Sequence, residues 1–117
     1  AGGRRAAREI LASGFRPTAM ICVNDFMAVG VLRELREQGL RVPEDISVTG
    51  FDNILLSEFC YPSLTTVHIP RDQIGHLAFE VLVPEVVPGK PPGREILIDP
   101  ELVLRESTGR AARGASA

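Results

Sequence analysis

The sequence has 117 residues, 44% hydrophobic and 24% charged, and 13 Lys and Arg against 15 Asp and Glu leave a net charge of −2. This size and composition are typical of one soluble domain, or part of one, and exclude a two-domain enzyme. Because no block of basic residues supplies the charge that phosphate binding needs, we do not expect this chain itself to hold DNA. No apolar stretch approaches the roughly 20 residues of a membrane span, so no membrane partner is expected.

The cysteines and histidines form no redox or metal-binding pattern. Cys22 lies in an apolar run and Cys60 in a distant aromatic segment, so we expect two free thiols in a reducing cytoplasm. His68 and His76 have no carboxylate or cysteine neighbours at ligand spacing, so we expect no metal site. The common signatures of catalytic and cofactor-binding loops are absent, so neither a catalytic residue nor a cofactor is predicted.

The first half of the chain predicts a β-α-β unit. Residues 4–13 carry apolar side chains at helical spacing, and the unbroken apolar run over 18–23 suits a strand covered on both faces in a parallel sheet. Residues 26–38 repeat the helical pattern up to Gly39, and 46–51 alternate as a second strand. This order predicts a right-handed crossover between two parallel strands.

The second half predicts shorter elements joined by turns. A β-branched strand spans 65–69 and a helix spans 71–83, which we expect to stop at Pro84 because proline breaks a helix interior. Two further strands are expected at 95–99 and 102–105. The predicted fold class is α/β, with a doubly wound parallel sheet.

Polar pairs follow both strands of the β-α-β unit. Asn24-Asp25 comes after the first strand and Asp52-Asn53 after the second, and open parallel sheets bind ligands at the carboxyl ends of their strands. A carboxylate accepts hydrogen bonds and an amide donates and accepts, which suits a polyol or nucleoside. The structural alternatives are a helix cap, favoured for Asp25 by position but also open to Asn24, and a turn at Asp52.

Several strings of the sequence form a pattern that extends over residues 4–108. They are 16–19 (RPTA), 23–30 (VNDFMAVG), 39–48 (GLRVPEDISV), 50–53 (GFDN), 64–67 (LTTV) and 102–108 (LVLREST). In this order and spacing they resemble the effector-binding domain of LacI/GalR-type bacterial transcription regulators. The resemblance implies a periplasmic-binding-protein-like core of two α/β subdomains with a small molecule between them, and a helix-turn-helix headpiece that binds DNA.

The resemblance also implies how much of such a regulator the chain contains. Residues 1–108 match the C-terminal portion of the effector-binding and dimerisation domain, and 109–117, rich in Ala, Gly and Arg, are expected to form a flexible tail. The headpiece and most of the first subdomain are then absent. The helix at 4–13 has no strand before it, which agrees with such a truncation. DNA is expected to be bound only through the missing headpiece.

The family pattern places effector-binding residues on the two polar pairs. Asn24 matches the cleft asparagine of these regulators, and Asp52 matches the acidic residue that accepts hydrogen bonds from the ligand. Ile21, Phe51 and Asp25 border the same edge as secondary cleft residues, with core packing as the alternative for Ile21 and Phe51.

An apolar segment over 54–64 suits the dimer interface that the family implies. It carries more apolar surface than a solvated loop usually shows, so it is expected to pack on something. The residues expected in a homodimer interface are Val29, Leu32, Phe59, Cys60 and Tyr61. The alternative is that all five pack in the core.

The function that the resemblance implies is effector sensing by a transcriptional regulator. A sugar- or nucleoside-like molecule would change the angle between the subdomains and so bias DNA binding by a dimer. Ile69 stands where relatives often carry Gln, which removes one polar contact with the ligand. The alternative is the sugar-binding receptor of a transport system, against which two free cysteines argue. An enzyme using Asp25 or Asp52 as a base is not expected, because no nucleophile-base pair lies near either.

Overall fold

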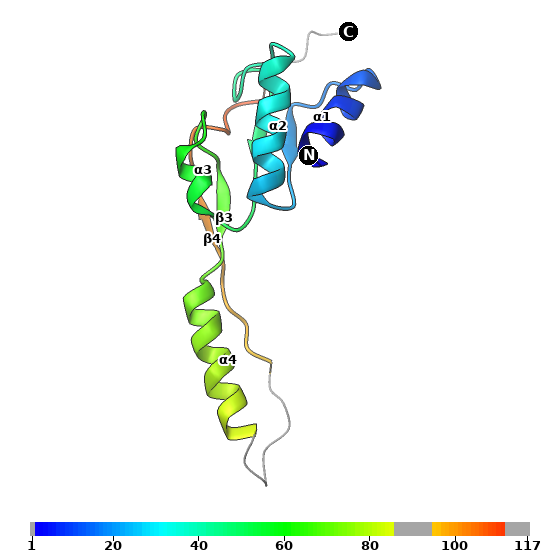
Figure 1. Cartoon of the computed structure of the whole chain (residues 1–117). Helices are drawn as coiled ribbons and strands as arrows, with labels where there is room; N and C mark the ends of the chain where they lie inside the picture. Colours follow the sequence, from blue (N-terminus) through cyan, green and yellow to red (C-terminus); the bar gives the residue numbers. More distant parts are fainter. Residues whose placement is uncertain (1, 86–94, 112–117) are drawn as a thin grey trace. The chain divides into compact units, whose positions relative to one another are not determined.

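The computed structural model describes residues 2–85 and 95–111, which form two compact units (Figure 1). The first unit contains residues 2–68 and 102–111, and the second contains 69–85 and 95–101. No helix within the described ranges is long and apolar enough to cross a membrane.

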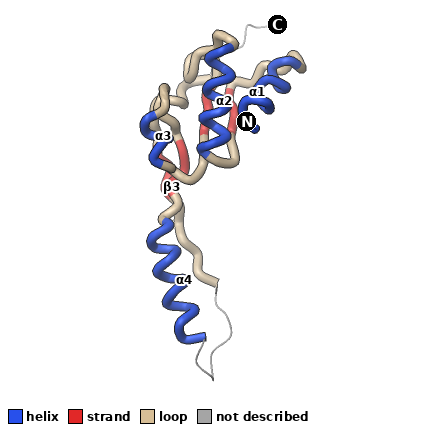
Figure 2. The backbone as a smooth tube through the Cα atoms, in the orientation of Figure 1, coloured by secondary structure: helices blue, strands red, loops and turns tan. Residues whose placement is uncertain are grey.

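The first unit contains the predicted β-α-β crossover. Strand β1 (Ala19–Ile21) pairs in parallel with β2 (Ser47–Thr49), and helix α2 (Asp25–Glu37) connects them (Figure 2). The backbone pairing continues beyond the strands, because the Cys22 amide donates to the Thr49 carbonyl at 2.9 Å. The expected α/β class with a parallel sheet is therefore confirmed.

A third parallel segment continues the sheet beyond β2. Parallel bridges join Thr49 to Thr65 and Asp52 to His68, and so place strand β3 (Thr66–His68) beside the end of β2. Strand β4 (Glu101–Val103) pairs with β3, and a short helix, α3 (Leu55–Phe59), occupies the predicted loop. Three parallel segments thus end at one edge.

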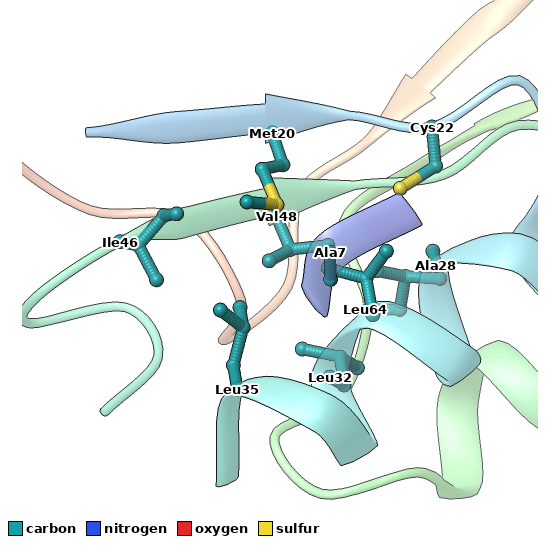
Figure 3. Packing of buried hydrophobic residues seen from close by; sticks show 10 residues of the cluster. Ala7, Met20, Cys22, Ala28, Leu32, Leu35, Ile46, Val48 and Leu64 are labelled. Atoms are coloured by element: carbon teal, nitrogen blue, oxygen red, sulfur yellow. The ribbon is translucent and has the colours of Figure 1, made fainter. Parts of the chain in front are cut away.

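The hydrophobic core lies between β1–β2 and the helices α1 (Gly2–Ala12) and α2 (Figure 3). Its buried apolar residues are Ala7, Met20, Cys22, Ala28, Val31, Leu32, Leu35, Ile46, Val48 and Leu64. The two helices approach closely because Gly3 has no side chain: a Cβ there would lie 2.1 Å from the Met27 carbonyl oxygen. Cys22 belongs to this core, and burial raises the pKa of its thiol to about 11.

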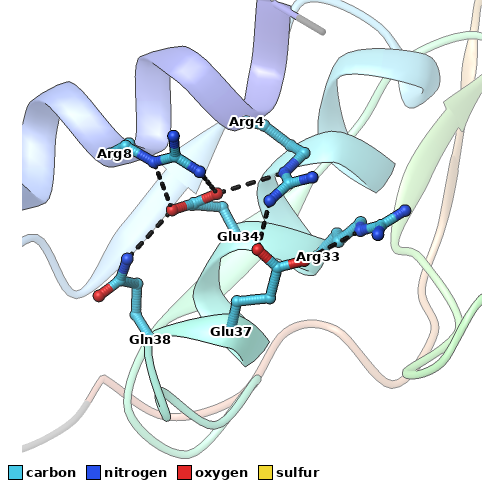
Figure 4. Close-up of polar contacts among 6 residues, drawn as sticks. All are labelled: Arg4, Arg8, Arg33, Glu34, Glu37 and Gln38. Carbon is cyan, nitrogen blue, oxygen red and sulfur yellow. Dashed lines mark hydrogen bonds and ion pairs between the residues drawn. The ribbon is translucent and has the colours of Figure 1, made fainter.

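A cluster of charged side chains fastens α1 to α2 (Figure 4). The wholly buried Glu34 carboxylate accepts two hydrogen bonds of 2.9 Å from Arg8, and further bonds from Gln38 at 3.1 Å and Arg4 at 3.3 Å. The Arg8 hydrogen bonds, followed by that from Gln38, lower the pKa of Glu34 to about 2. Glu34 is therefore ionised at neutral pH and holds two arginines of α1.

Only one face of β1 is covered by the described residues. Met20 is buried in the core, whereas Ile21 is 87% exposed, and Val23 is exposed too. Helices α1 and α2 both pack on the Met20 side, as Figure 3 shows. The expectation of cover on both faces of this strand is therefore wrong for the described part of the chain.

The second unit departs from two predictions. Helix α4 (Arg71–Glu85) includes Pro84, so the expected stop before the proline is wrong. Proline has no N–H to donate to the Glu80 carbonyl. The helix therefore includes Pro84 at the loss of one backbone hydrogen bond. Residues 95–100 have no regular structure, so the strand predicted at 95–99 is not formed.

Side-chain hydrogen bonds hold the segment that follows β4 against β2 and the residue before β3. The Thr65 hydroxyl accepts from the Arg105 amide at 2.9 Å, and the buried Ser107 hydroxyl donates to the Val48 carbonyl at 2.6 Å. The Gly109 amide donates to Ser47 Oγ at 3.1 Å, so the predicted tail is attached at its start. Residues 112–117 of that tail lie outside the described residues.

Candidate functional site

Three parallel segments present their carboxyl ends at one edge of the first unit. Asn24 follows β1, Asp52 follows β2 and His68 ends β3. The Asp52 amide donates to the Val67 carbonyl at 3.0 Å, which keeps the ends of β2 and β3 in register. The structure therefore places Asn24 and Asp52 at the kind of edge where parallel sheets bind ligands.

Asn24 caps helix α2. Its backbone is extended, and its Oδ1 accepts from the Met27 amide at 2.9 Å. The position-based preference for Asp25 as the cap is wrong. Asn24 is half-buried, and no partner for its Nδ2 is found among the described residues. The cap uses the oxygen and leaves two N–H donors on Nδ2.

Asp25 is a buried link between strands and not a cleft residue. Its side chain has no exposed surface, and it accepts from the Thr66 hydroxyl at 2.6 Å and the Ile54 amide at 2.8 Å. A Cβ at Gly50 would lie 2.1 Å from Asp25 Oδ1, so glycine is required for this approach. The expected secondary cleft role of Asp25 is corrected, since a side chain without exposed surface meets no ligand.

Asp52 and Asn53 form a strained turn at the end of β2. Their φ angles are 105° and 50°, both in the left-handed region that non-glycine residues rarely occupy. Both residues are half-buried. Consecutive residues held in this region mark positions whose surroundings fix the backbone, and such positions gather at ligand sites.

A polar cluster that the sequence analysis missed holds this turn. Arg105 donates to Asn53 Oδ1 at 2.8 Å, to Ser57 Oγ at 2.9 Å and to the Leu64 carbonyl at 2.9 Å. Asn53 Nδ2 lies 3.2 Å from His68 Nδ1. Arg105 lies in the LVLREST string, but nothing in the local sequence connects it to residues more than forty positions earlier.

The apolar neighbours of the edge differ in exposure. Ile21 is largely exposed and Phe51 is partly exposed, so neither is a core residue within the first unit. Within the described residues, the core alternative is therefore wrong for both. The exposed side chain of Ile21 follows from the uncovered face of β1.

A surface groove of about 490 Å³ brings together four of the five residues expected at a dimer interface. Its lining residues are Val29, Leu32, Arg33, Arg36, Glu37, Cys60 and Tyr61. Tyr61 is 83% exposed, whereas Leu32 is buried and chiefly belongs to the core. Phe59 is exposed but does not line the groove. Burial raises the pKa of the Cys60 thiol.

Comparison with known proteins identifies the family. Residues 1–108 match the periplasmic binding protein-like domain. The chain belongs to the periplasmic binding protein-like family. It is 44% identical over 105 residues to the HTH-type transcriptional repressor PurR of Escherichia fergusonii, covering 90% of this chain and 31% of that relative. The chain thus spans about a third of the length of the curated relatives it matches.

Solved structures of regulators share this periplasmic binding protein-like fold. A LacI family transcriptional regulator from Arthrobacter sp. FB24 in complex with lactose is 37% identical, with a TM-score of 0.81 over 92% of this chain and 41% of that one. The lac repressor dimer bound to operator and an anti-inducer is 35% identical, with a TM-score of 0.84 over 91% of this chain and 37% of that one. The predicted resemblance to LacI/GalR-type regulators is confirmed.

His76 Nε2 lies 3.2 Å from Glu80, four residues later in α4, so the expectation that this histidine has no carboxylate neighbour is wrong. No metal site is nevertheless found in the part of the chain that the structure describes. No group of three or more His, Cys, Asp and Glu side chains there could hold a metal ion. Cys22 and Cys60 are both free thiols.

Proposed function

We propose that this chain is the effector-sensing and dimerisation module of a LacI-family transcriptional regulator that acts in the cytoplasm. A small sugar- or nucleoside-like molecule binds at the edge that carries Asn24 and Asp52, and so controls DNA binding. The observation that carries this proposal is the Asp52-Asn53 turn, held in the left-handed region at the carboxyl ends of three parallel segments.

The chemistry of the edge suits such an effector. Asn24 Nδ2 supplies N–H donors and the Asp52 carboxylate supplies acceptors, which together match hydroxyls or ring nitrogens. The exposed side chain of Ile21 and the partly exposed Phe51 supply apolar surface for a sugar or base face. A ligand that binds one closure state more tightly than another shifts the equilibrium between them.

The matched relatives support a regulatory role. One is named as a repressor with a helix-turn-helix, and the solved lac repressor is a dimer bound to operator. In this proposal, DNA is bound by a helix-turn-helix headpiece that lies outside residues 1–117. Because the matched relatives are transcriptional repressors, we do not propose a transport receptor. The burial of Asp25 removes it as the base of an enzyme.

Homodimerisation through the 490 Å³ groove completes the proposal. Tyr61 stands exposed beside the buried edge of Leu32, with the half-buried Val29 and Cys60 alongside, and an aromatic anchor with apolar neighbours suits the centre of an interface. Arg33, Arg36 and Glu37 supply a polar rim. Sedimentation of the native polypeptide that carries this chain tests this part, and a monomer at high concentration contradicts it.

Calorimetry on the native polypeptide tests the effector site, with lactose and inosine as probes of the two ligand classes. We expect Asp52→Asn to weaken binding of the responsive probe by about 1.5–3 kcal/mol, or roughly tenfold to a hundredfold, because hydrogen bonds to a charged acceptor are lost. Asp99→Asn, an exposed change of the same type, is the control and leaves binding unchanged. An unchanged dissociation constant in Asp52→Asn removes the site, and no binding of either probe contradicts the ligand class.

A further inference from the structure

Arg105 determines which way the Asn53 amide points. A guanidinium group only donates hydrogen bonds, so the Asn53 atom 2.8 Å from Arg105 Nη2 must be the amide oxygen. The guanidinium is itself held, because its Nη1 donates to the Leu64 carbonyl at 2.9 Å. Asparagine oxygen and nitrogen are usually assigned from their partners, and here the partner leaves one choice.

The orientation of Asn53 in turn determines which ring nitrogen of a neutral His68 carries the proton. Asn53 Nδ2 carries two N–H donors and no acceptor, and it lies 3.2 Å from His68 Nδ1. Nδ1 must therefore accept, which requires an unprotonated nitrogen. A neutral imidazole with an unprotonated Nδ1 carries its proton on Nε2. The three side chains thus form a one-way relay from Arg105 to Asn53 to His68.

This relay ends beside the proposed effector residue. His68 and Asp52 are paired across the ends of β3 and β2, and His68 is half-buried. The same Asn53 amide that sets the histidine follows Asp52 directly in the strained turn. His68, which carries a hydrogen-bond donor, and Asp52, which carries acceptors, are therefore paired residues on neighbouring strand ends.

We propose that Arg105, acting through Asn53, holds His68 as its Nε2–H tautomer, so that the edge presents a fixed donor at His68 beside the acceptor at Asp52. Arg105 and Asn53 are positioning residues, and His68 is a specificity-determining residue. The site then selects an effector that carries an acceptor and a donor on neighbouring atoms. Adjacent hydroxyls of a sugar and the N–H and C=O of a purine base share this chemistry. The tautomer stands on the geometry alone, whereas the selection rests on the proposed function.

Nitrogen NMR of the histidine rings tests the tautomer without any effector. The chain has two histidines, and His76, whose Nε2 lies 3.2 Å from Glu80 on the exposed side of α4, is an internal control. Long-range proton–nitrogen spectra of the labelled chain near neutral pH report which ring nitrogen carries a proton. We expect an unprotonated Nδ1 and a protonated Nε2 in His68. A protonated Nδ1 in His68 overturns the relay.

Asn53→Asp reverses the relay with almost no change of shape. An aspartate tolerates the left-handed backbone as asparagine does, and its carboxylate keeps the Arg105 partner but only accepts. We expect His68 Nδ1 to gain a proton while the signals of His76 stay in place. An unprotonated Nδ1 in Asn53→Asp overturns the role of Asn53. If this variant does not fold, Arg105→Lys is measured instead, since losing the planar fork releases the amide and mixes the two tautomers of His68.

Effector titrations of the native polypeptide test the selection, again with lactose for adjacent hydroxyls and inosine for the purine edge. We expect His68→Glu, which replaces the donor with an acceptor, to weaken binding of the responsive probe at least about tenfold. His68→Gln keeps an N–H donor and is expected to weaken binding less. If Asp52→Asn weakens binding and His68→Glu does not, the inference fails and the proposed site stands. If neither variant changes binding, the proposed site fails as well, and the ring spectra still decide the tautomer.

Discussion

Helix α2 buries one carboxylate toward each of its ends, and the two are satisfied by different chemistry. Asp25, the first residue of the helix, accepts from the Thr66 hydroxyl and the Ile54 amide, which are neutral donors. Glu34, near the other end, accepts from the guanidinium groups of α1 and from Gln38. Neither side chain has exposed surface. The two carboxylates are therefore equally buried but differ in how freely their hydrogen-bond partners can move.

The hydrogen-bond partners of the two carboxylates determine how much structural change each end of the helix tolerates. Thr66 is as buried as Asp25, and Gly50 leaves no room beside the carboxylate, so nothing near Asp25 can rearrange without stranding a charge. Arg8 is 60% exposed, so it can turn to water when its partner changes. The end of α2 that supports the candidate effector edge is thus rigid, and the end that holds α1 is adjustable.

Gly50→Ala, at the Asp25 end, is expected to cause the largest loss of stability. The new methyl would lie 2.1 Å from Asp25 Oδ1 and 2.8 Å from Leu64 Cδ2, so the carboxylate must leave its donors inside the protein. We expect a loss of about 3 kcal/mol or more in the free energy of unfolding, measured by urea denaturation.

Gly75→Ala is the matched control, because a Cβ there meets nothing within 4 Å. It lies inside helix α4 and has an ordinary helical backbone, so alanine is expected to stabilise by about 0.5–1 kcal/mol. Equal stability changes in the two variants contradict the rigidity of the Asp25 end.

Thr66→Val is expected to have the next largest effect. Valine keeps the shape of threonine and removes the hydroxyl that donates to Asp25 at 2.6 Å, and a hydrogen bond to a charged group is worth about 1.5–3 kcal/mol. The control is Thr18→Val, an exposed change of the same kind, for which we expect almost no effect on the urea midpoint. A destabilisation as small as that of the control means that the hydroxyl does not hold the carboxylate.

The sequence predicts the parts of this structure that depend on local order. Apolar spacing places α2 and the strands beside it, because a helix between two strands follows from residues close in the chain. It also identifies Asn24 and Asp52, which come directly after strands whose carboxyl ends share an edge. These features need only short-range patterns and the handedness of the crossover.

The missed features depend on contacts between distant segments. Asp25 looks like a helix cap until Thr66, from a strand forty-one residues later, is seen to donate to it. Arg105 shows no local sign that it orients Asn53, fifty-two positions earlier. Pro84 illustrates the opposite error, because a strong local rule predicts a stop before it, yet helix α4 includes it.

Glu34→Gln is expected to destabilise the fold at neutral pH and to lose this effect in acid. Its folded pKa of about 2 lies below its ordinary value of 4.5, because Arg8 and Gln38 donate to the charged form. The ionised carboxylate therefore stabilises the fold fully above about pH 4.5, and this contribution is lost as the pH falls through about 2. The glutamine variant lacks this contribution at every pH, so its stability falls less between neutral pH and acid.

Urea midpoints of wild type and Glu34→Gln measured across that acid range test this directly. Glu9→Gln, which changes an exposed glutamate of α1 beside Arg5, is the control and follows the wild-type curve. Convergence of the wild-type and Glu34→Gln curves in acid shows that an adjustable charge pair holds α1. Curves that stay parallel contradict the pairing, because an unshifted carboxyl contributes equally to the folded and unfolded chains.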